Sequence, residues 1–112
     1  MTREERYKIY NGTAKAIVSE LDRLIEAKDK LAKLPKVKPQ ILIDDDDEYQ
    51  ENLEISYERR ECLDIITECN EYIIDNIAFF SENGLLMAFK DWLVFTCQGD
   101  RIQKLTNLGF KL

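Results

Sequence analysis

The sequence contains no histidine, and its three cysteines, Cys62, Cys69 and Cys97, form no Cys-x-x-Cys pair. The lack of histidine and of a Cys-x-x-Cys pair argues against a zinc site and against a Cys–His nucleophile. Cys62 and Cys69 are two helical turns apart, about 10 Å, which is too far for a disulfide bond. We therefore expect three free cysteines that act as small buried hydrophobic residues in a reducing compartment.

Glycine and proline are also scarce, with four and two residues among 112, which disfavours an all-β fold with many turns. No apolar run approaches the roughly 20 residues that a membrane span requires. The first residues, Met-Thr-Arg-Glu-Glu-Arg, are charged and precede no apolar segment of the kind found in signal peptides. The sequence therefore predicts a single cytoplasmic domain over residues 1–112, with one core and no contact with a membrane.

The chain has a net charge of −6, and its charges are segregated along the sequence. Residues 1–38 carry ten basic and six acidic side chains, residues 39–83 carry two and fourteen, and residues 84–112 carry four and two. The acidic middle third argues against direct binding to nucleic acid, because phosphate contacts need clustered lysine and arginine. The same balance suits a protein partner with a basic surface.

Two long segments show the helical spacing of apolar residues. Residues 3–34 place apolar side chains on one face and lysines on the opposite face, with Gly12 as a weak position. Pro35 ends this helix, and residues 35–46 form an extended connection in which residues 41–43 are expected to lie over the core as a strap. Residues 47–82 are predicted to form the longest helix. Its predicted core face consists of Ile55, Cys62, Leu63, Ile66, Cys69, Ile73, Ile74, Ile77 and Phe80.

Two shorter helices are predicted after Gly84, a residue that tolerates the left-handed backbone found at helix ends. Residues 85–98 are apolar nearly all round, so we expect a helix that is buried on most sides, with Phe89, Trp92 and Phe95 mainly in the core. Residues 93–97 also suit a strand by composition, although the chain offers no convincing partner strand. Asp100 is expected to cap a last helix over residues 101–108.

These patterns together predict an all-α fold. Two long amphipathic helices form an antiparallel pair, and the two shorter C-terminal helices pack against them to complete a small helical bundle.

Four consecutive aspartates, Asp44, Asp45, Asp46 and Asp47, stand at the start of the longest predicted helix. Acids at this position complement the positive end of the helix dipole, each by roughly 0.3–1 kcal/mol. A calcium loop is excluded, because residues 44–55 contain no glycine and the twelfth residue from Asp44 is Ile55 rather than an acid. Helix capping is the leading interpretation, contact with a basic partner is the second, and a divalent metal site is the third.

Acids also recur at three-residue spacing on this helix. Glu48-x-x-Glu51 and Glu61-x-x-Asp64 resemble the two motifs with which the all-α nucleotide pyrophosphohydrolases bind Mg²⁺. The resemblance is confined to these two short motifs and implies a Mg²⁺-dependent enzyme. In that family the motifs lie on two helices, whereas here both lie on one, and octahedral Mg²⁺ needs convergent oxygen ligands. We therefore expect no catalytic residues, no cofactor and no metal.

The longest predicted helix carries a second apolar stripe away from its core face. Tyr57, Ile65, Tyr72 and Phe79 fall among its acids when residues are placed about 100° apart. The stripe is edged by Glu58, Glu61, Glu68 and Asp75. In one interpretation another helix of the chain covers the stripe, so that the long acidic helix lies centrally between the basic ends. In the other, the stripe is an exposed aromatic surface with an acidic rim, suited to self-association or to docking on a basic protein.

These features favour a small acidic protein-binding module, either an inhibitor or an adaptor. Its candidate binding residues are the four aspartates and the second stripe with its acidic edge. A nucleic-acid-handling or defence protein is one kind of partner, by analogy with the small inhibitors that phages make against their hosts. Two alternatives stay open, an obligate homodimer whose stripes form a bundle between chains and the Mg²⁺-dependent enzyme.

Overall fold

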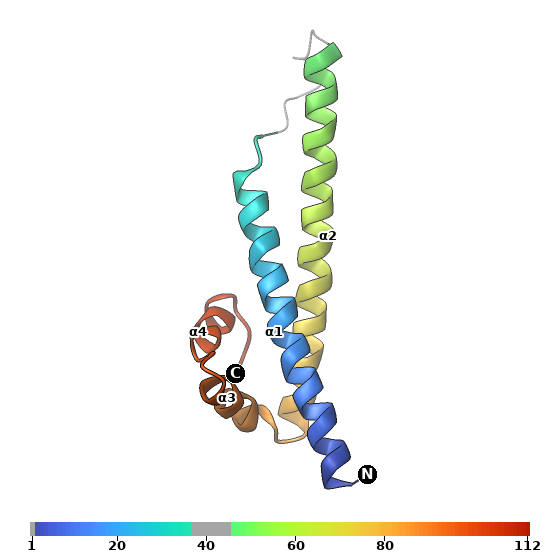
Figure 1. The fold of residues 1–112 in the computed structure, drawn as a ribbon. Coiled ribbons are helices and arrows are strands. Elements are labelled where there is room, and N and C mark those ends of the chain that lie inside the picture. Colours follow the sequence, from blue (N-terminus) through green and yellow to red (C-terminus); the bar gives the residue numbers. More distant parts are fainter. Residues whose placement is uncertain (1, 37–45) are drawn as a thin grey trace.

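The computed structural model describes residues 2–36 and 46–112, which form four α-helices and no strands (Figure 1). Helix α1 spans Arg3–Lys33, α2 spans Asp46–Glu82, α3 spans Leu86–Phe95 and α4 spans Asp100–Asn107. Helices α1 and α2 run antiparallel, and α3 and α4 lie together beside the lower part of α1. The predicted all-α fold is confirmed, and each helix begins and ends within three residues of its predicted bounds.

Local sequence accounts for both ends of α1. The Glu5 amide donates a hydrogen bond to the Thr2 hydroxyl at 3.2 Å, and the Thr2 amide donates to the Glu5 carboxylate at 3.1 Å. This reciprocal capping box satisfies two amides that the first helical turn leaves without partners. At the other end Leu34 takes an extended backbone, as expected for a residue that precedes proline, so the helix ends at Lys33.

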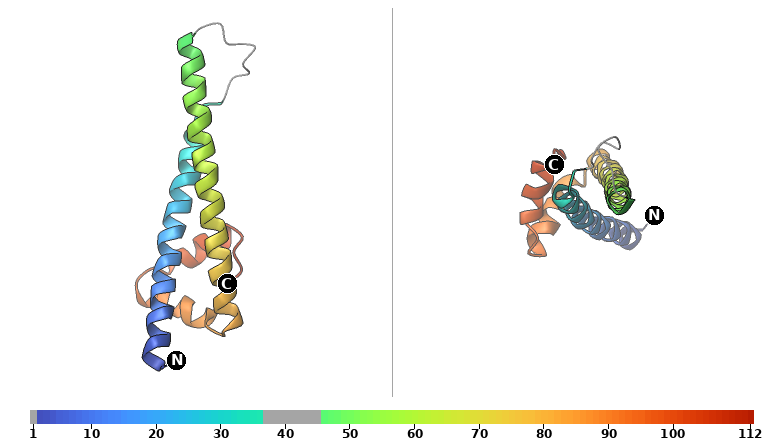
Figure 2. Two further views of the ribbon diagram at one scale, coloured as in Figure 1. Left: turned by 90° about the vertical axis from the view of Figure 1, so that its right-hand side faces the viewer. Right: turned by 90° about the horizontal axis from the view of Figure 1, so that it is seen from above.

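The molecule is elongated, at 65 × 27 × 20 Å. Its radius of gyration is 19.1 Å, whereas a compact domain of this length has about 13 Å. Seen from above, α1 lies between α2 and the pair formed by α3 and α4 (Figure 2). The first turns of α2 extend past the end of α1 (Figure 1), so only the later part of α2 packs against another helix.

The core is a narrow line of side chains between α1 and α2 that widens where α3 and α4 pack. At the wide end, the ring of Phe80 lies 5.5 Å from that of Tyr10 and 5.2 Å from that of Phe89. The Tyr10 hydroxyl donates a hydrogen bond to the Ala88 carbonyl at 2.6 Å, which ties α1 to α3. The buried residues of the described ranges are Ala14, Ile17, Leu21, Leu24, Ala27, Cys62, Cys69, Ile73, Ile77, Phe80, Phe89, Leu93, Leu105 and Phe110.

Leu63 and Ile74 were predicted to lie on the core face of α2, and this prediction was wrong. They are 44 % and 55 % exposed, whereas Cys69 and Ile73 are fully buried. The nine residues assigned to that face span a wide arc of the helix. Because α2 packs mainly against α1, a single neighbour covers the arc around Cys69 and Ile73 and leaves the flank with Leu63 and Ile74 open.

Helix α3 ends three residues earlier than predicted, at Phe95. Cys97 adopts a left-handed backbone with a φ of 61°, and the Gln98 amide reaches back to the Leu93 carbonyl at 2.7 Å. This arrangement ends a helix sharply. Phe95 next to the turn is 90 % exposed and Cys97 is exposed, so the prediction that both residues are buried was wrong, whereas Phe89 is buried as predicted.

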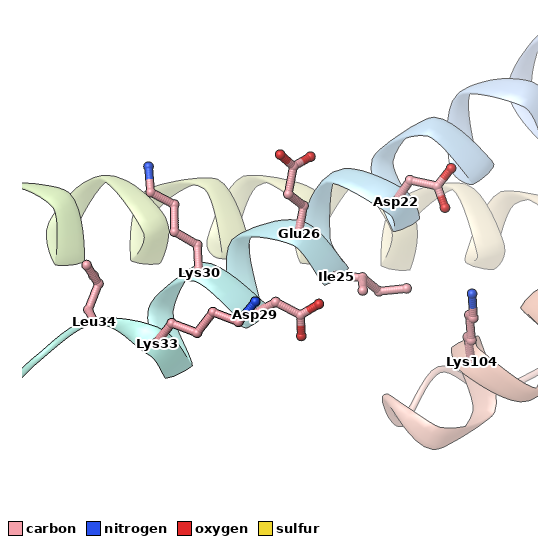
Figure 3. A pocket seen from close by; sticks show the side chains of 8 residues that line it. All are labelled: Asp22, Ile25, Glu26, Asp29, Lys30, Lys33, Leu34 and Lys104. Atoms are coloured by element: carbon pink, nitrogen blue, oxygen red, sulfur yellow. The ribbon is translucent and has the colours of Figure 1, made fainter.

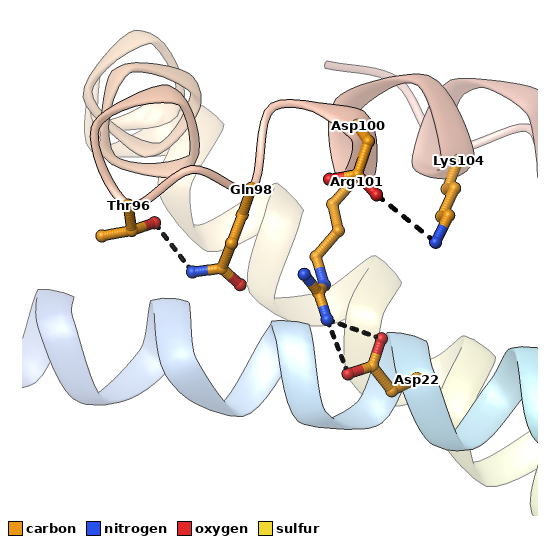
Figure 4. Close-up of polar contacts among 6 residues, drawn as sticks. All are labelled: Asp22, Thr96, Gln98, Asp100, Arg101 and Lys104. Carbon is orange, nitrogen blue, oxygen red and sulfur yellow. Dashed lines mark hydrogen bonds and ion pairs between the residues drawn. The ribbon is translucent and has the colours of Figure 1, made fainter.

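Helix α4 is held against α1 by an ion pair (Figure 4). One terminal nitrogen of the Arg101 guanidinium donates to both carboxylate oxygens of Asp22, at 2.8 and 3.0 Å. Asp100 does not cap α4 as predicted, because the chain is already helical at Gly99, and Asp100 instead pairs with Lys104 one turn later at 3.5 Å. The residues of this helix and its end that were predicted to face inward do pack on the core: Ile102, Leu105 and Leu108.

The two glycines Gly12 and Gly84 give a matched test of backbone energetics. Gly12 lies inside α1, where a Cβ would meet no atom within 4 Å. Gly12→Ala is expected to raise the free energy of unfolding by about 0.5–1 kcal/mol, because alanine loses less backbone freedom on forming a helix. Gly84 has a φ of +67°, so Gly84→Ala is expected to lower the same quantity by about 1–2 kcal/mol. Urea denaturation measures both changes, and a change of the same sign in the two variants would contradict this account.

Candidate protein-interaction surface

Helix α2 exposes three aromatic side chains along one flank. Tyr57, Tyr72 and Phe79 are 63 %, 37 % and 42 % exposed. At about 100° per residue they lie well away from the side of α2 that carries the buried Cys69 and Ile73. The described part of the chain therefore leaves these aromatic rings accessible to another molecule.

Acidic side chains fill the spaces between these aromatic residues. Glu61, Glu68 and Asp75 lie on the same flank, Glu58 borders it, and all four are exposed. We call this set the acidic–aromatic face: Tyr57, Glu58, Glu61, Glu68, Tyr72, Asp75 and Phe79. Helix α2 as a whole carries twelve acidic and two basic side chains, so the potential around this face is strongly negative.

Ile65, the remaining residue of the predicted stripe, lies at the border between α2 and α1. It is partly buried against the core. Together with Arg23 and Glu61 it lines a small groove of about 240 Å³ between the two helices. The guanidinium of Arg23 also approaches the Glu68 carboxylate, at 3.8 Å. The acidic–aromatic face therefore begins at the edge of α1 and continues around the open side of α2.

The aspartate run is only partly within the described residues. Asp46 and Asp47 lie in the first turn of α2 and are exposed, where they complement the helix dipole. Asp44, Asp45 and the predicted strap at residues 41–43 lie outside the described residues. The first turn of α2, which contains these two acids, lies at one end of the rod (Figure 1), so they extend the negative surface beyond Tyr57.

Of the two interpretations of the second stripe, the one that places the long acidic helix centrally does not agree with the structure. Helix α1 is the central helix (Figure 2), and both α3 and α4 contact it, through the Tyr10–Ala88 hydrogen bond and the Asp22–Arg101 ion pair. The far side of α2 has no neighbouring helix among the described residues. A physical reason is hydration, because a helix packed there would remove water from Glu68 and the other carboxylates of that flank.

A wider groove, of about 610 Å³, lies on α1 next to α4 (Figure 3). Both acidic and basic side chains line it, and the carboxylates are spread along α1 instead of meeting at one point. Such a mixed rim selects neither anions nor cations, and the groove contains no pair of a nucleophile and a base. Its lining residues are Asp22, Ile25, Glu26, Asp29, Lys30, Lys33, Leu34 and Lys104.

The two motifs that resemble the pyrophosphohydrolase metal site do not converge. Glu48-x-x-Glu51 and Glu61-x-x-Asp64 both lie on α2, about 20 Å apart along the helix axis. No group of three or more metal-ligating side chains is gathered in residues 2–36 and 46–112. The geometry of the described residues therefore gives the resemblance no support.

The structure also exposes apolar side chains that were not anticipated as surface residues. Met87, Val94 and Phe95 of α3 are 70 %, 62 % and 90 % exposed, and Leu63 and Ile74 of α2 have already been described. The sequence signal for this exposure was the width of the apolar arc in each helix, because a single helical neighbour covers only one side of that arc. Both helices carry more apolar residues than the fold buries.

No protein-family model, no curated protein and no solved structure matches this chain. None of the helices in the described ranges combines the length and the apolar character needed to cross a bilayer. The functional inference therefore depends on the exposed surface of α2.

The three cysteines differ in environment and should differ in reactivity. All three are free, Cys62 and Cys69 are buried, and Cys97 is exposed. The Cys69 thiol donates a hydrogen bond to the Glu20 carboxylate at 3.1 Å. Burial and this hydrogen bond raise the pKa of Cys69 from 9.0 to about 11, so very little reactive thiolate is present near neutral pH.

We expect one cysteine of the native protein to react rapidly with a thiol reagent at pH 8, and that cysteine is Cys97. Cys62 and Cys69 should react only at the rate at which the core opens, because a buried thiol must first reach solvent. A time course with a chromogenic disulfide measures the number of fast thiols, and Cys97→Ser should abolish the fast phase. Two or more fast thiols in the native protein would contradict the burial described for α2.

Proposed function

We propose that this protein is a binding module that docks the acidic–aromatic face of α2 on a basic surface of a protein partner, as an inhibitor or an adaptor. The observation that carries the proposal is the exposure of Tyr72 and Phe79 between the carboxylates of Glu68 and Asp75 on an ordered helix. The proposal involves no catalytic step, cofactor or metal. Its three free cysteines suit a reducing compartment such as the cytoplasm.

The two kinds of side chain on this face have separate roles in binding. Exposed tyrosine and phenylalanine supply large apolar areas that are stiff, and such residues are typical anchors at the centre of interfaces. The surrounding carboxylates accelerate encounter with a positively charged surface and disfavour partners that are acidic. Proteins that handle nucleic acid carry such positive surfaces, so blocking one of them is the concrete version of the proposal.

The test compares capture by the wild-type chain and by two double variants from a lysate of the native source. The face variant is Tyr72→Ala with Glu68→Lys. Its matched control changes the same number of exposed residues elsewhere, Phe95→Ala on α3 with Glu26→Lys on α1. We expect the face variant to bind the captured partner at least about 30-fold more weakly, since loss of one central aromatic anchor costs about 2 kcal/mol or more.

Salt gives an independent measurement for the same partner. The affinity of the wild type should fall as the ionic strength rises, and this dependence should be weaker for Glu68→Lys. If the face variant and the wild type capture the same proteins with equal affinity, the acidic–aromatic face is not the binding site.

A further inference from the structure

A different flank of α2 carries no acid at all. Its residues recur at three- and four-residue steps and therefore form one stripe along the helix. We call it the acid-free face: Leu63, Thr67, Asn70, Ile74, Ala78 and Ser81. Leu63 and Ile74 are its two large apolar side chains, 44 % and 55 % exposed. Although α2 carries twelve acids, this stripe contains none of them. It therefore lacks the negative charge with which the acidic–aromatic face would attract a basic partner.

The C-terminal half of the acid-free face, which we call its lower half, forms one wall of a groove. Ile74, Ala78 and Ser81 of α2 line a space of about 580 Å³ together with the chain that follows α4, including Phe110 and Lys111. The space is mostly apolar in its lining residues. Its size is comparable to that of many natural binding clefts, which span about 300–1,000 Å³.

The N-terminal part of α2, residues 46–61, offers a surface that could fill such a groove, and we call it the upper half of the helix. None of residues 46–61 is buried, and the first turns of the helix extend past the end of α1 (Figure 1). Tyr49 in this part is 37 % exposed. Each molecule therefore presents both a length of α2 beside which no other helix of the described residues lies and a groove that no described helix fills.

We propose that a second copy of the chain binds along the acid-free face in an antiparallel orientation, with the upper half of each α2 in the groove of the other copy. The two-fold arrangement satisfies both surfaces at once, since a two-fold interface uses the same patch on each copy. A parallel arrangement would place groove beside groove and leave both empty.

Charge favours the same orientation. Residues 46–61 carry seven acidic and two basic side chains, whereas residues 83–112 carry four basic and two acidic side chains. An antiparallel pair brings the acidic end of one copy next to the basic end of the other. A parallel pair would bring the two acidic ends together, and repulsion between them would oppose association.

The exposed apolar residues fix the register. Leu63 of each copy faces Ile74 of the other when the two-fold axis passes midway between these positions, beside Thr67 and Asn70. Polar residues at the centre of such a seam specify register in other helical pairs. The acidic–aromatic face lies on another flank of α2 and stays accessible, so this inference stands independently of the proposed function.

Sedimentation equilibrium from micromolar to millimolar concentration tests the association, because it reports mass independently of shape. The wild type should approach twice the mass of one chain. Ile74→Glu should raise the dissociation constant by about 100-fold, since the symmetric pair loses the same contact twice. Val94→Glu on α3 is the matched control at a similarly exposed valine, and it should leave the association unchanged.

Both positions are more than half exposed, so neither variant should alter the melting temperature of the monomer, and this measurement verifies that the fold is retained. A wild type that stays monomeric throughout, or a dimer that is unaffected by Ile74→Glu, would overturn the proposal. So would a dimer that Val94→Glu weakens to the same extent.

Disulfide cross-linking tests orientation and register in a Cys97→Ser background. Leu63→Cys mixed with Ile74→Cys should form a disulfide between copies under mild oxidation. Each variant alone should not, because identical positions are offset by about 16 Å along the helix axis. Rapid cross-linking of Leu63→Cys with itself would indicate a parallel pair and contradict the inferred arrangement.

Discussion

Replacing Phe80 with alanine is expected to lower the free energy of unfolding by about 3–5 kcal/mol, the largest effect of any single substitution considered for this protein. Phe80 is fully buried and its ring contacts those of Tyr10 and Phe89, so it joins α1, α2 and α3 at one point. Alanine would leave a cavity lined by the other two rings. An elongated molecule with so few buried residues has little other core to compensate.

Phe95→Ala is the matched control, because it makes the same chemical change at a phenylalanine that is 90 % exposed. Its effect on stability should stay within about 0.5 kcal/mol. Urea denaturation monitored by circular dichroism gives both values. A small loss for Phe80→Ala, similar to that for Phe95→Ala, would show that the three-ring cluster does not hold the helices together.

The two halves of α2 should differ by at least about 100-fold in amide hydrogen-exchange protection. Residues 46–61 contain no buried side chain, whereas residues 62–82 contain Cys62, Cys69, Ile73, Ile77 and Phe80 in the core. The upper half can therefore open without exposing core. Amides of the lower half exchange only when α2 separates from α1, which costs most of the global stability.

The Ile74→Glu variant provides the reference state for this experiment, since it should stay monomeric. In the wild type at high concentration, the protection of residues 46–61 should rise if the second copy covers them. In the variant it should stay low. Equal protection in the two halves of α2 of the monomeric variant would contradict the described division of the helix.

The order and type of the helices could be predicted from the sequence because the local signals agree. Apolar spacing and Pro35 indicate the same end for α1, and apolar spacing and Gly84 indicate the same end for α2. Gly84 and Gly109 have the positive φ angles expected of helix-ending glycines. Predictions that depended on how the helices pack were less successful. Leu63 and Ile74 were assigned to the core because helical spacing gives the width of the apolar arc but does not show how much of it a neighbour covers.

The same limitation affected the candidate surface. The acids and aromatic residues of the acidic–aromatic face could be found from spacing alone, since they lie on one continuous helix. Whether they were covered depended on which helix was central, and that choice is made by contacts between distant parts of the chain. The Tyr10–Ala88 hydrogen bond and the Asp22–Arg101 ion pair place α3 and α4 on α1. No local pattern around Asp22 or Ala88 indicates these contacts.

The elongated shape also affects how the protein migrates in solution. A compact protein with a radius of gyration of 19.1 Å would contain about 300 residues. Gel filtration separates molecules by hydrodynamic radius, so a single chain of 112 residues should elute well ahead of globular standards of equal mass. Early elution is therefore a property of the monomeric rod, and a column calibrated with globular proteins would mistake one chain for an oligomer.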